Sequence, residues 1–216
     1  MPFYKKIDFS ERITVYLWKI TETYNELFET VSLKEESIIR LKKMRSESHQ
    51  KSFLAVRMLL QHCGYTDYDL YYDQRGKPML NLDNSKIPVE ISISHSSSFS
   101  ALALSKEPVG IDLERIKEKV LRIAPRYMNM KHIESLPIEN QIQKATVIWG
   151  IKESIFKIKN EIGISFPDHI FEKTFNLDDK QCKAELHFNN KIEYFSIDFC
   201  VVEDYILVSA FREQKS

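Results

Sequence analysis

The order of the predicted elements occurs twice along this chain, and the repetition limits the folds that it can adopt. β-branched and aromatic residues favour strands, and apolar residues three and four positions apart favour helices. On these signals, predicted strands lie at 13–18, 90–94, 99–104, 109–114, 170–175, 184–188, 194–202 and 205–211, and the longer predicted helices at 47–63 and 140–161. The pattern predicts an α+β fold of two pseudo-symmetric halves, residues 1–105 and 106–216, each a small, mainly antiparallel sheet packed on a long helix.

Composition restricts the class of protein and of partner. The chain has 216 residues, of which 43% are hydrophobic, and this is enough for a core without disulfides. It carries 31 basic and 31 acidic residues, a balance that argues against a nucleic-acid or membrane-surface protein. No apolar run approaches the ~20 residues of a membrane span. Because the three cysteines are scattered, we expect free thiols and a cytoplasmic protein.

The predicted strand at 109–114 places two acids on one face. Apolar and polar residues alternate along Val109–Glu114, so Asp112 and Glu114 point the same way. Two like charges about 7 Å apart on one strand repel each other. A bound cation between the carboxylates would explain the pair, and so would simple solvation of an outward-facing strand.

The predicted helix at 140–161 is apolar on two sides. One side carries Val147, Ile151, Ile155 and Ile158, and the other carries Trp149 and Phe156, which flank Glu153. A helix that is apolar on two sides is buried on two sides. We expect one side to pack on its own sheet and the second to face the other half, with Glu153 and Lys157 between the halves. An ordinary surface ion pair four residues apart is the other explanation of these two residues.

Polar stretches in the first half are candidates for phosphate contacts. His95 lies among serines at the end of a predicted strand, and Lys77 lies in the turn Arg75–Pro78. Imidazole, hydroxyl and ammonium groups donate to phosphate oxygens, although the same residue types also build ordinary turns. Arg57, at the edge of the apolar face of the predicted helix at 47–63, could bind a second phosphate with two parallel hydrogen bonds.

Taken together and in this order, four motifs resemble the 4′-phosphopantetheinyl transferase superfamily, in particular its larger, two-half type that activates surfactin synthetase. The motifs are Gly76–Pro78, Ser92–Ser96, Val109–Glu114 and Trp149–Lys157. The resemblance implies Mg²⁺-dependent transfer of the 4′-phosphopantetheine arm of coenzyme A to a serine of an apo acyl or peptidyl carrier protein, with release of 3′,5′-ADP. Such a holo-[acyl-carrier-protein] synthase serves fatty-acid, polyketide or nonribosomal peptide biosynthesis. The resemblance also implies a monomer with its active site between the two halves.

The same resemblance implies a role for individual residues. The implied Mg²⁺ ligands are Asp112, Glu114 and Glu153, and the implied catalytic residues are Glu153, as base toward the attacking serine, and Lys157. The residues implied to bind coenzyme A are Arg57, Lys77, Pro78, Ser94, His95, Asp112, Lys152 and Lys157. Nucleotide binding then falls to residues 1–105, and the metal site and catalytic helix to residues 106–216. Where family members usually have an acid after Arg126 and Tyr127, this chain has His132 nearby.

A basic segment is the candidate docking surface for the carrier. Between Arg115 and Lys131 there are six basic residues and one acid, Glu118. Because carrier proteins of this kind are usually acidic, we expect docking near residues 115–132. A solvated basic helix is the alternative explanation of the segment.

Two other functions fit the same motifs. One is a Mg²⁺-dependent hydrolase of a nucleotide diphosphate, which would use the same acids and lysines. The other is an inactive module that binds coenzyme A or a carrier protein. Incubation with coenzyme A, Mg²⁺ and an apo carrier separates the three functions by the products that form.

Overall fold

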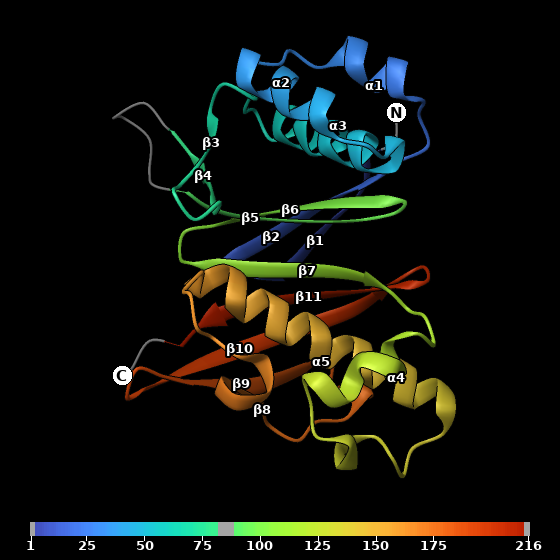
Figure 1. Cartoon of the computed structure of the whole chain (residues 1–216), viewed down its shortest axis with the longest axis vertical. Helices are drawn as coiled ribbons and strands as arrows, with labels where there is room; N and C mark the ends of the chain where they lie inside the picture. The colour runs from blue at the N-terminus through green and yellow to red at the C-terminus, as the bar shows by residue number, and fades with distance from the viewer. Residues whose placement is uncertain (1–2, 82–88, 214–216) are drawn as a thin grey trace. The chain divides into compact units, whose positions relative to one another are not determined.

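The computed structural model describes residues 3–81 and 89–213 and divides the chain into two units, Met1–Glu107 and Pro108–Ser216. Figure 1 draws the first unit in blue to green and the second in green to red. Each unit contains an antiparallel sheet and helices, which confirms the predicted α+β fold class. The functional division between residues 105 and 106 stays a prediction.

The first unit is built on a four-stranded sheet. Its strands are β1 (Phe3–Ser10), β2 (Ile13–Lys19), β5 (Glu90–Ser96) and β6 (Phe99–Ser105), hydrogen-bonded in the order β1-β2-β6-β5. Helices α1 (Tyr24–Thr30), α2 (Glu35–Lys43) and α3 (Glu47–His62) follow β2, and a hairpin of β3 (Leu70–Tyr72) and β4 (Pro78–Leu80) precedes β5. Ala55 and Leu59 of α3 are buried in one apolar cluster with Trp18 and Leu102 of the sheet. Their spacing of four residues puts them on the same side of the helix.

The second unit is built on a five-stranded antiparallel sheet. Its strands are β7 (Val109–Arg115), β8 (Ile170–Glu172), β9 (Gln181–Phe188), β10 (Lys191–Val202) and β11 (Tyr205–Arg212), in the order β7-β11-β10-β9-β8. Helix α5 (Ile138–Lys159) lies along one face of this sheet (Figure 1). Its side chains Ile151 and Ile155 are buried with Phe195 and Val208 of the sheet. In this strand order β7 and β8 are the two edge strands of the sheet, and α5 contacts both of them.

Short helical turns connect these elements. They are α4 (Val120–Ile123), η1 (Ala124–Arg126), η2 (Met130–His132), α6 (Phe166–His169) and η3 (Leu177–Asp179). The basic segment 115–132 is therefore a chain of short turns and not one helix. None of the helices in the described ranges is long and apolar enough to cross a membrane.

Strand β1 and helix α1 of the first unit have no counterpart among the predicted elements. β1 is an edge strand with mostly exposed and half-exposed residues, so it lacks the alternation of apolar and polar residues that indicates a strand. α1 begins with a capping box in which Thr23 and Glu26 bond to each other's backbone N–H groups. The Thr-x-x-Glu pattern is the sequence signal that locates this helix start.

Candidate active site

Helix α5 and strand β7 touch at Gly110. A Cβ atom on Gly110 would lie 1.9 Å from the backbone oxygen of Ser154, so a larger residue would push the helix away. Gly150 has a similar function toward β11, because a Cβ there would lie 2.5 Å from Val208 Cγ2. The two glycines let the helix backbone lie close to the sheet. They thereby bring the polar side of α5 next to the two predicted acids of β7.

Lys157 binds Asp112 across this contact. The Lys157 Nζ donates to Asp112 Oδ1 and to the backbone oxygen of Ile111, both at 2.8 Å. Asp112 is buried, whereas the Lys157 side chain keeps 28% of its surface exposed. The ammonium group is thus held beside a buried carboxylate and can still meet a ligand from solvent.

Two further acids lie within electrostatic range of Asp112. Burial and the neighbouring charge of Asp112 raise the pKa of Glu114 to about 7, and a hydrogen bond with Trp149 partly offsets the rise. Burial and Asp112 also raise the pKa of Glu153, while Lys157 lowers it. The sequence-predicted residues Asp112, Glu114, Glu153 and Lys157 therefore lie close enough for their charges to act on one another.

The chemistry of this cluster fits a divalent cation with hard oxygen ligands. All three acids offer carboxylate oxygens, the donors that Mg²⁺ prefers in proteins. Burial and, after it, the repulsion from Asp112 raise the pKa values of Glu114 and Glu153, and a cation among the acids would offset both effects. Over residues 3–81 and 89–213, however, no group of three or more His, Cys, Asp or Glu side chains is already arranged to hold a metal ion. The Mg²⁺ assignment accordingly stays a prediction.

Trp149 orients one of these acids and was not among the predicted site residues. Its side chain hydrogen-bonds to Glu114, and its ring lies 5.1 Å from that of Tyr127 and 5.7 Å from that of Phe166. The same Phe166 ring lies 5.9 Å from that of Phe156. Both aromatic residues of the second apolar side of α5 thus pack on rings of their own unit. The expectation that this side of the helix faces the other half stays a prediction. A half-buried indole N–H needs an acceptor, a signal that could have identified Trp149.

Lys152 lies on a different side of α5 from Lys157. Its side chain is buried, and its Nζ binds Glu172 Oε2 at 2.6 Å and the backbone oxygen of Ile170. Burial lowers the pKa of Lys152, while Glu172 acts in the opposite direction. The implied contact of Lys152 with a diphosphate stays a prediction, and this partner set gives it no support.

Four of the predicted residues of the first unit lie on strands β4 and β5 or next to them. Lys77 precedes β4, and its Nζ lies 3.5 Å from Glu90 Oε2 at the start of β5. Pro78 opens β4, where it pairs with Tyr72. Ser94 is buried and His95 exposed near the end of β5, about 16 Å along the strand from Glu90 at ~3.3 Å per residue. His49 of α3, which the sequence did not single out, has its ring centroid 6.3 Å from that of His95.

Arg57 is engaged inside the first unit. It is 3% exposed, and its Nε donates to Asp67 Oδ1 at 2.9 Å. Its Nη1 donates to the backbone oxygen of Phe53, and its guanidinium carbon lies 3.4 Å from the centre of the Phe53 ring. The implied contact with coenzyme A stays a prediction, and these partners assign Arg57 instead to the joint between α3 and the loop at Asp67.

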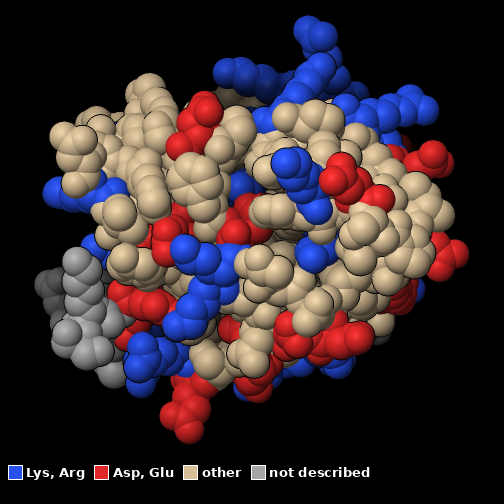
Figure 2. Space-filling view, turned by 90° about the horizontal axis from the view of Figure 1, so that it is seen from below, with Lys and Arg blue, Asp and Glu red and all other residues tan. Residues whose placement is uncertain are grey.

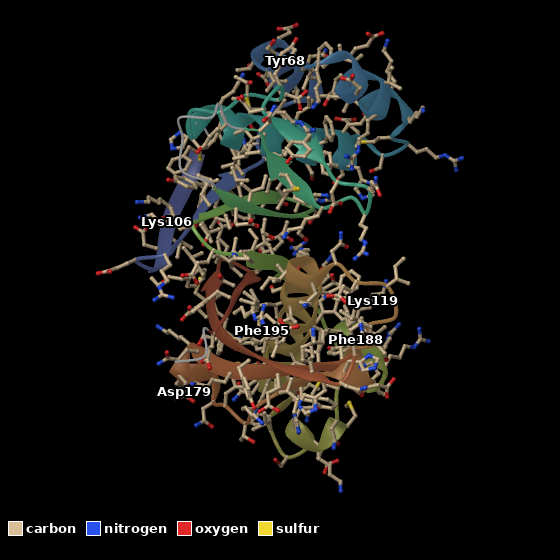
Figure 3. The ribbon with its side chains drawn as sticks, turned by 90° about the vertical axis from the view of Figure 1, so that its left-hand side faces the viewer. Tyr68, Lys106, Lys119, Asp179, Phe188 and Phe195 are labelled. Carbon is tan, nitrogen blue, oxygen red and sulfur yellow. The ribbon has the colours of Figure 1, made fainter. Side chains whose placement is uncertain are left out.

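The basic side chains of the docking segment face solvent. All six are exposed, namely Arg115, Lys117, Lys119, Arg122, Arg126 and Lys131. Lys119 is labelled in Figure 3, next to the label of Phe188. Figure 2 shows one face of the molecule, on which Lys and Arg side chains protrude along the upper edge. Between the basic positions, Ala124 and Tyr127 are buried. The segment therefore presents charge outward while it is fixed to the unit by apolar side chains.

Comparison with known proteins finds similarity to one family of transferases. Residues 108–208 match the family model described as the 4′-phosphopantetheinyl transferase superfamily. The chain is 30% identical over 128 residues to the 4′-phosphopantetheinyl transferase gsp of Aneurinibacillus migulanus, which covers 58% of this chain and 50% of that protein. It is 31% identical over 120 residues to the 4′-phosphopantetheinyl transferase psf-1 of Bacillus pumilus, covering 50% and 49%. The chain thus spans about half the length of the curated relatives it matches.

Proposed function

We infer the function from the premise that the chain belongs to the 4′-phosphopantetheinyl transferase superfamily. We propose that it is a holo-[acyl-carrier-protein] synthase, which transfers the 4′-phosphopantetheine arm of coenzyme A to a serine of an apo acyl or peptidyl carrier protein. The observation that carries this proposal is the cluster of Asp112, Glu114 and Glu153 beside Lys157, inside the matched residues 108–208. A set of acids with one accessible lysine suits the transfer of a phosphate group between two oxygens.

Glu153 is the proposed base of the reaction. The serine oxygen of the carrier forms a bond to the phosphorus of the arm, the bond from that phosphorus to the ADP oxygen breaks, and Glu153 takes the serine proton. Burial and the nearby Asp112 raise the pKa of Glu153, which makes its carboxylate a better proton acceptor near neutral pH. Mg²⁺, held by Asp112, Glu114 and Glu153, would supply positive charge to the diphosphate.

Lys157 is the proposed partner of the leaving 3′,5′-ADP. Its ammonium group is fixed by Asp112 and by the backbone oxygen of Ile111, so it needs no reorganisation when negative charge develops on the ADP oxygens. In the first unit, Lys77, Pro78, Ser94 and His95 are proposed to bind the nucleotide part of coenzyme A. The exposed imidazole of His95 supports a phosphate contact there.

The carrier is proposed to dock on residues 115–132. The exposure of all six basic side chains supports an acidic partner, because opposite charges steer association and fix its orientation. We further propose a cytoplasmic monomer that serves fatty-acid, polyketide or nonribosomal peptide biosynthesis. The free thiols of Cys63, Cys182 and Cys200 support a reducing compartment.

Mass spectrometry of an apo carrier protein tests the proposal. The carrier is incubated with the chain, coenzyme A and Mg²⁺, and a mass increment of one phosphopantetheine per carrier is expected. The matched control is a carrier whose acceptor serine is replaced by alanine, which should gain no mass. Release of 3′,5′-ADP without a gain in carrier mass would instead indicate the hydrolase, and binding without any product would indicate the inactive module.

A further inference from the structure

Glu172 of strand β8 joins helix α5 to the docking segment 115–132. Its Oε2 binds Lys152 Nζ at 2.6 Å, and its Oε1 lies 3.0 Å from Nδ1 of His132. His132 is the last residue of the docking segment, and Lys152 precedes the proposed base Glu153 in the chain. One carboxylate therefore holds the end of the segment and the middle of the catalytic helix at the same time.

The burial of this group indicates a role in positioning. The side chains of Lys152 and Glu172 are only 3% and 4% exposed, whereas that of His132 is 37% exposed. Burial of an ion pair costs desolvation energy that its Coulomb attraction often fails to recover, so such pairs are poor sources of stability. What a buried pair with complete hydrogen bonding does provide is one defined geometry. In this case the geometry relates α5, β8 and the docking segment.

Tyr127 provides a second anchor of the same segment. Its hydroxyl donates to the backbone oxygen of Ala145 in α5 at 3.0 Å, and its ring packs on that of Trp149. Tyr127 and His132 thus attach the segment to α5 directly and through Glu172. The exposed Lys131 and Arg126 lie next to these anchors in the chain. Any shift of an anchor moves charges that are proposed to meet the carrier.

We propose that His132 and Glu172 are positioning residues for the carrier protein. They fix the position of the docking segment relative to Lys152. Because Glu153 follows Lys152 in the helix, they also fix the segment relative to Glu153. The inference rests on the proposed function, because it concerns the carrier protein that is proposed to dock on this segment. It assigns no contact with coenzyme A to His132, so loss of His132 affects the carrier and the nucleotide substrate differently.

Steady-state kinetics with the full chain test this difference. His132→Ala removes the contact with Glu172, and we expect the KM for the carrier to rise about tenfold, the effect of one hydrogen bond to a charged group. The KM for coenzyme A should stay within about twofold on the same scale. His132→Asn keeps an N–H donor near the position of Nδ1 and should restore most of the affinity for the carrier.

A second histidine supplies a matched control. His187 pairs with Glu185 at 2.8 Å and is 42% exposed, so it resembles His132 in partner and exposure but lies on β9, outside the docking segment. His187→Ala should leave the KM for the carrier unchanged. An unchanged KM for the carrier in His132→Ala, or an equal rise in the KM for coenzyme A, would overturn the inference.

Hydrogen exchange separates failure of this inference from failure of the proposed function. In His132→Ala, amides of residues 127–133 should exchange faster than in the unmodified chain, and His132→Asn should reverse the change. If the unmodified chain transfers no phosphopantetheine, the proposed function fails, and direct binding of the apo carrier replaces the kinetic measurement. Unchanged exchange, or a carrier that binds both chains equally, contradicts the positioning role in either case.

Discussion

Helix α5 is held to both edges of its sheet by lysines with the same kinds of partner. Lys157 binds a backbone oxygen and the carboxylate of Asp112 on β7, and Lys152 binds a backbone oxygen and the carboxylate of Glu172 on β8. The two contacts differ in exposure, since the Lys157 side chain is 28% exposed and the Lys152 side chain 3%. They also differ in the number of charged groups around the acid that the lysine binds. At the β8 edge His132 binds the second oxygen of the acid, whereas at the β7 edge two further acids surround Asp112.

The difference teaches which contact is structural and which one is suited to chemistry. A lysine that is buried with its acid has its ammonium group already engaged, which favours a structural role. A partly exposed lysine among three acids leaves negative charge that a proton or an external cation can balance. Four predictions test this contrast between the β8 edge and the β7 edge.

The largest effect is expected for Glu153→Gln at the β7 edge. Removal of the proposed base should lower kcat about 10²–10⁴-fold, the usual contribution of a general base. Coenzyme A should still bind, because the amide keeps the size of the side chain. Carrier modification followed by mass spectrometry measures the rate, and calorimetry measures the binding. Glu139→Gln, an exposed acid in the first turn of the same helix, is the control, and near-normal turnover of Glu153→Gln would refute the assignment.

The two lysines should differ in their contribution to stability. Lys152→Met leaves Glu172 without its buried counter-ion and should lower the free energy of unfolding by about 3–5 kcal/mol. Lys157→Met also leaves a buried acid, Asp112, but its lysine is partly exposed, so water can enter beside the acid and the loss should be smaller, about 1–3 kcal/mol. Urea unfolding of both variants measures the difference. Equal losses would mean that the β7 edge is as closed as the β8 edge.

The acids of the β7 edge should make the effect of Mg²⁺ depend on pH. Because the folded chain raises the pKa of Glu114 from 4.5 to about 7, the stability linked to its protonated form is present below pH 4.5 and is lost as pH rises through about 7. Mg²⁺ must displace that proton at low pH. The rise in Tm on adding Mg²⁺ should therefore be larger at pH 8 than at pH 6. Glu114→Gln should weaken this dependence, and an equal rise at both pH values would argue against the cation site.

The smallest effect is expected at the surface of the docking segment. Replacement of both Lys119 and Arg122 by Glu should raise the KM for an acidic carrier severalfold. This corresponds to a loss of about 1 kcal/mol of binding free energy for the two substitutions together. The rise should shrink at high ionic strength, because salt screens exposed charges. The control is Lys191→Glu, an exposed lysine at the start of β10. If both variants behave alike, the segment does not form the interface.

The sequence predicted the β7 edge far better than the β8 edge. Alternation along Val109–Glu114 was enough to place Asp112 and Glu114 on one face, because the period of a strand is fixed. Nothing local separated Lys152 from Lys157, since both are lysines on a helix. Their difference arises from which strand lies under each side chain. Glu172 lies twenty residues beyond Lys152 in the chain, so the pairing depends on sheet topology.

The buried partner of Arg57 escaped prediction for a related reason. Asp67 lies in the loop after α3 and becomes its partner only when that loop folds back on the helix. Ser37 Oγ and the backbone N–H of Lys34 also donate to Asp67, which ties α2 to the same point. Periodicity identifies the face of a helix but not the loop residue that will cover it.

The close contact at Gly110 also restricts the register in which β7 can pair with β11. Gly110 pairs with Ala210 of β11, and the register continues through Asp112 with Val208 and Glu114 with Ile206. A slip of one residue would turn Ile111 toward α5 and both acids away from it. Since even one added carbon at Gly110 collides with the backbone of Ser154, the slipped strand could not accept the helix. The smallest residue of β7 thus favours the native register over the one-residue slip that would leave the site without its acids.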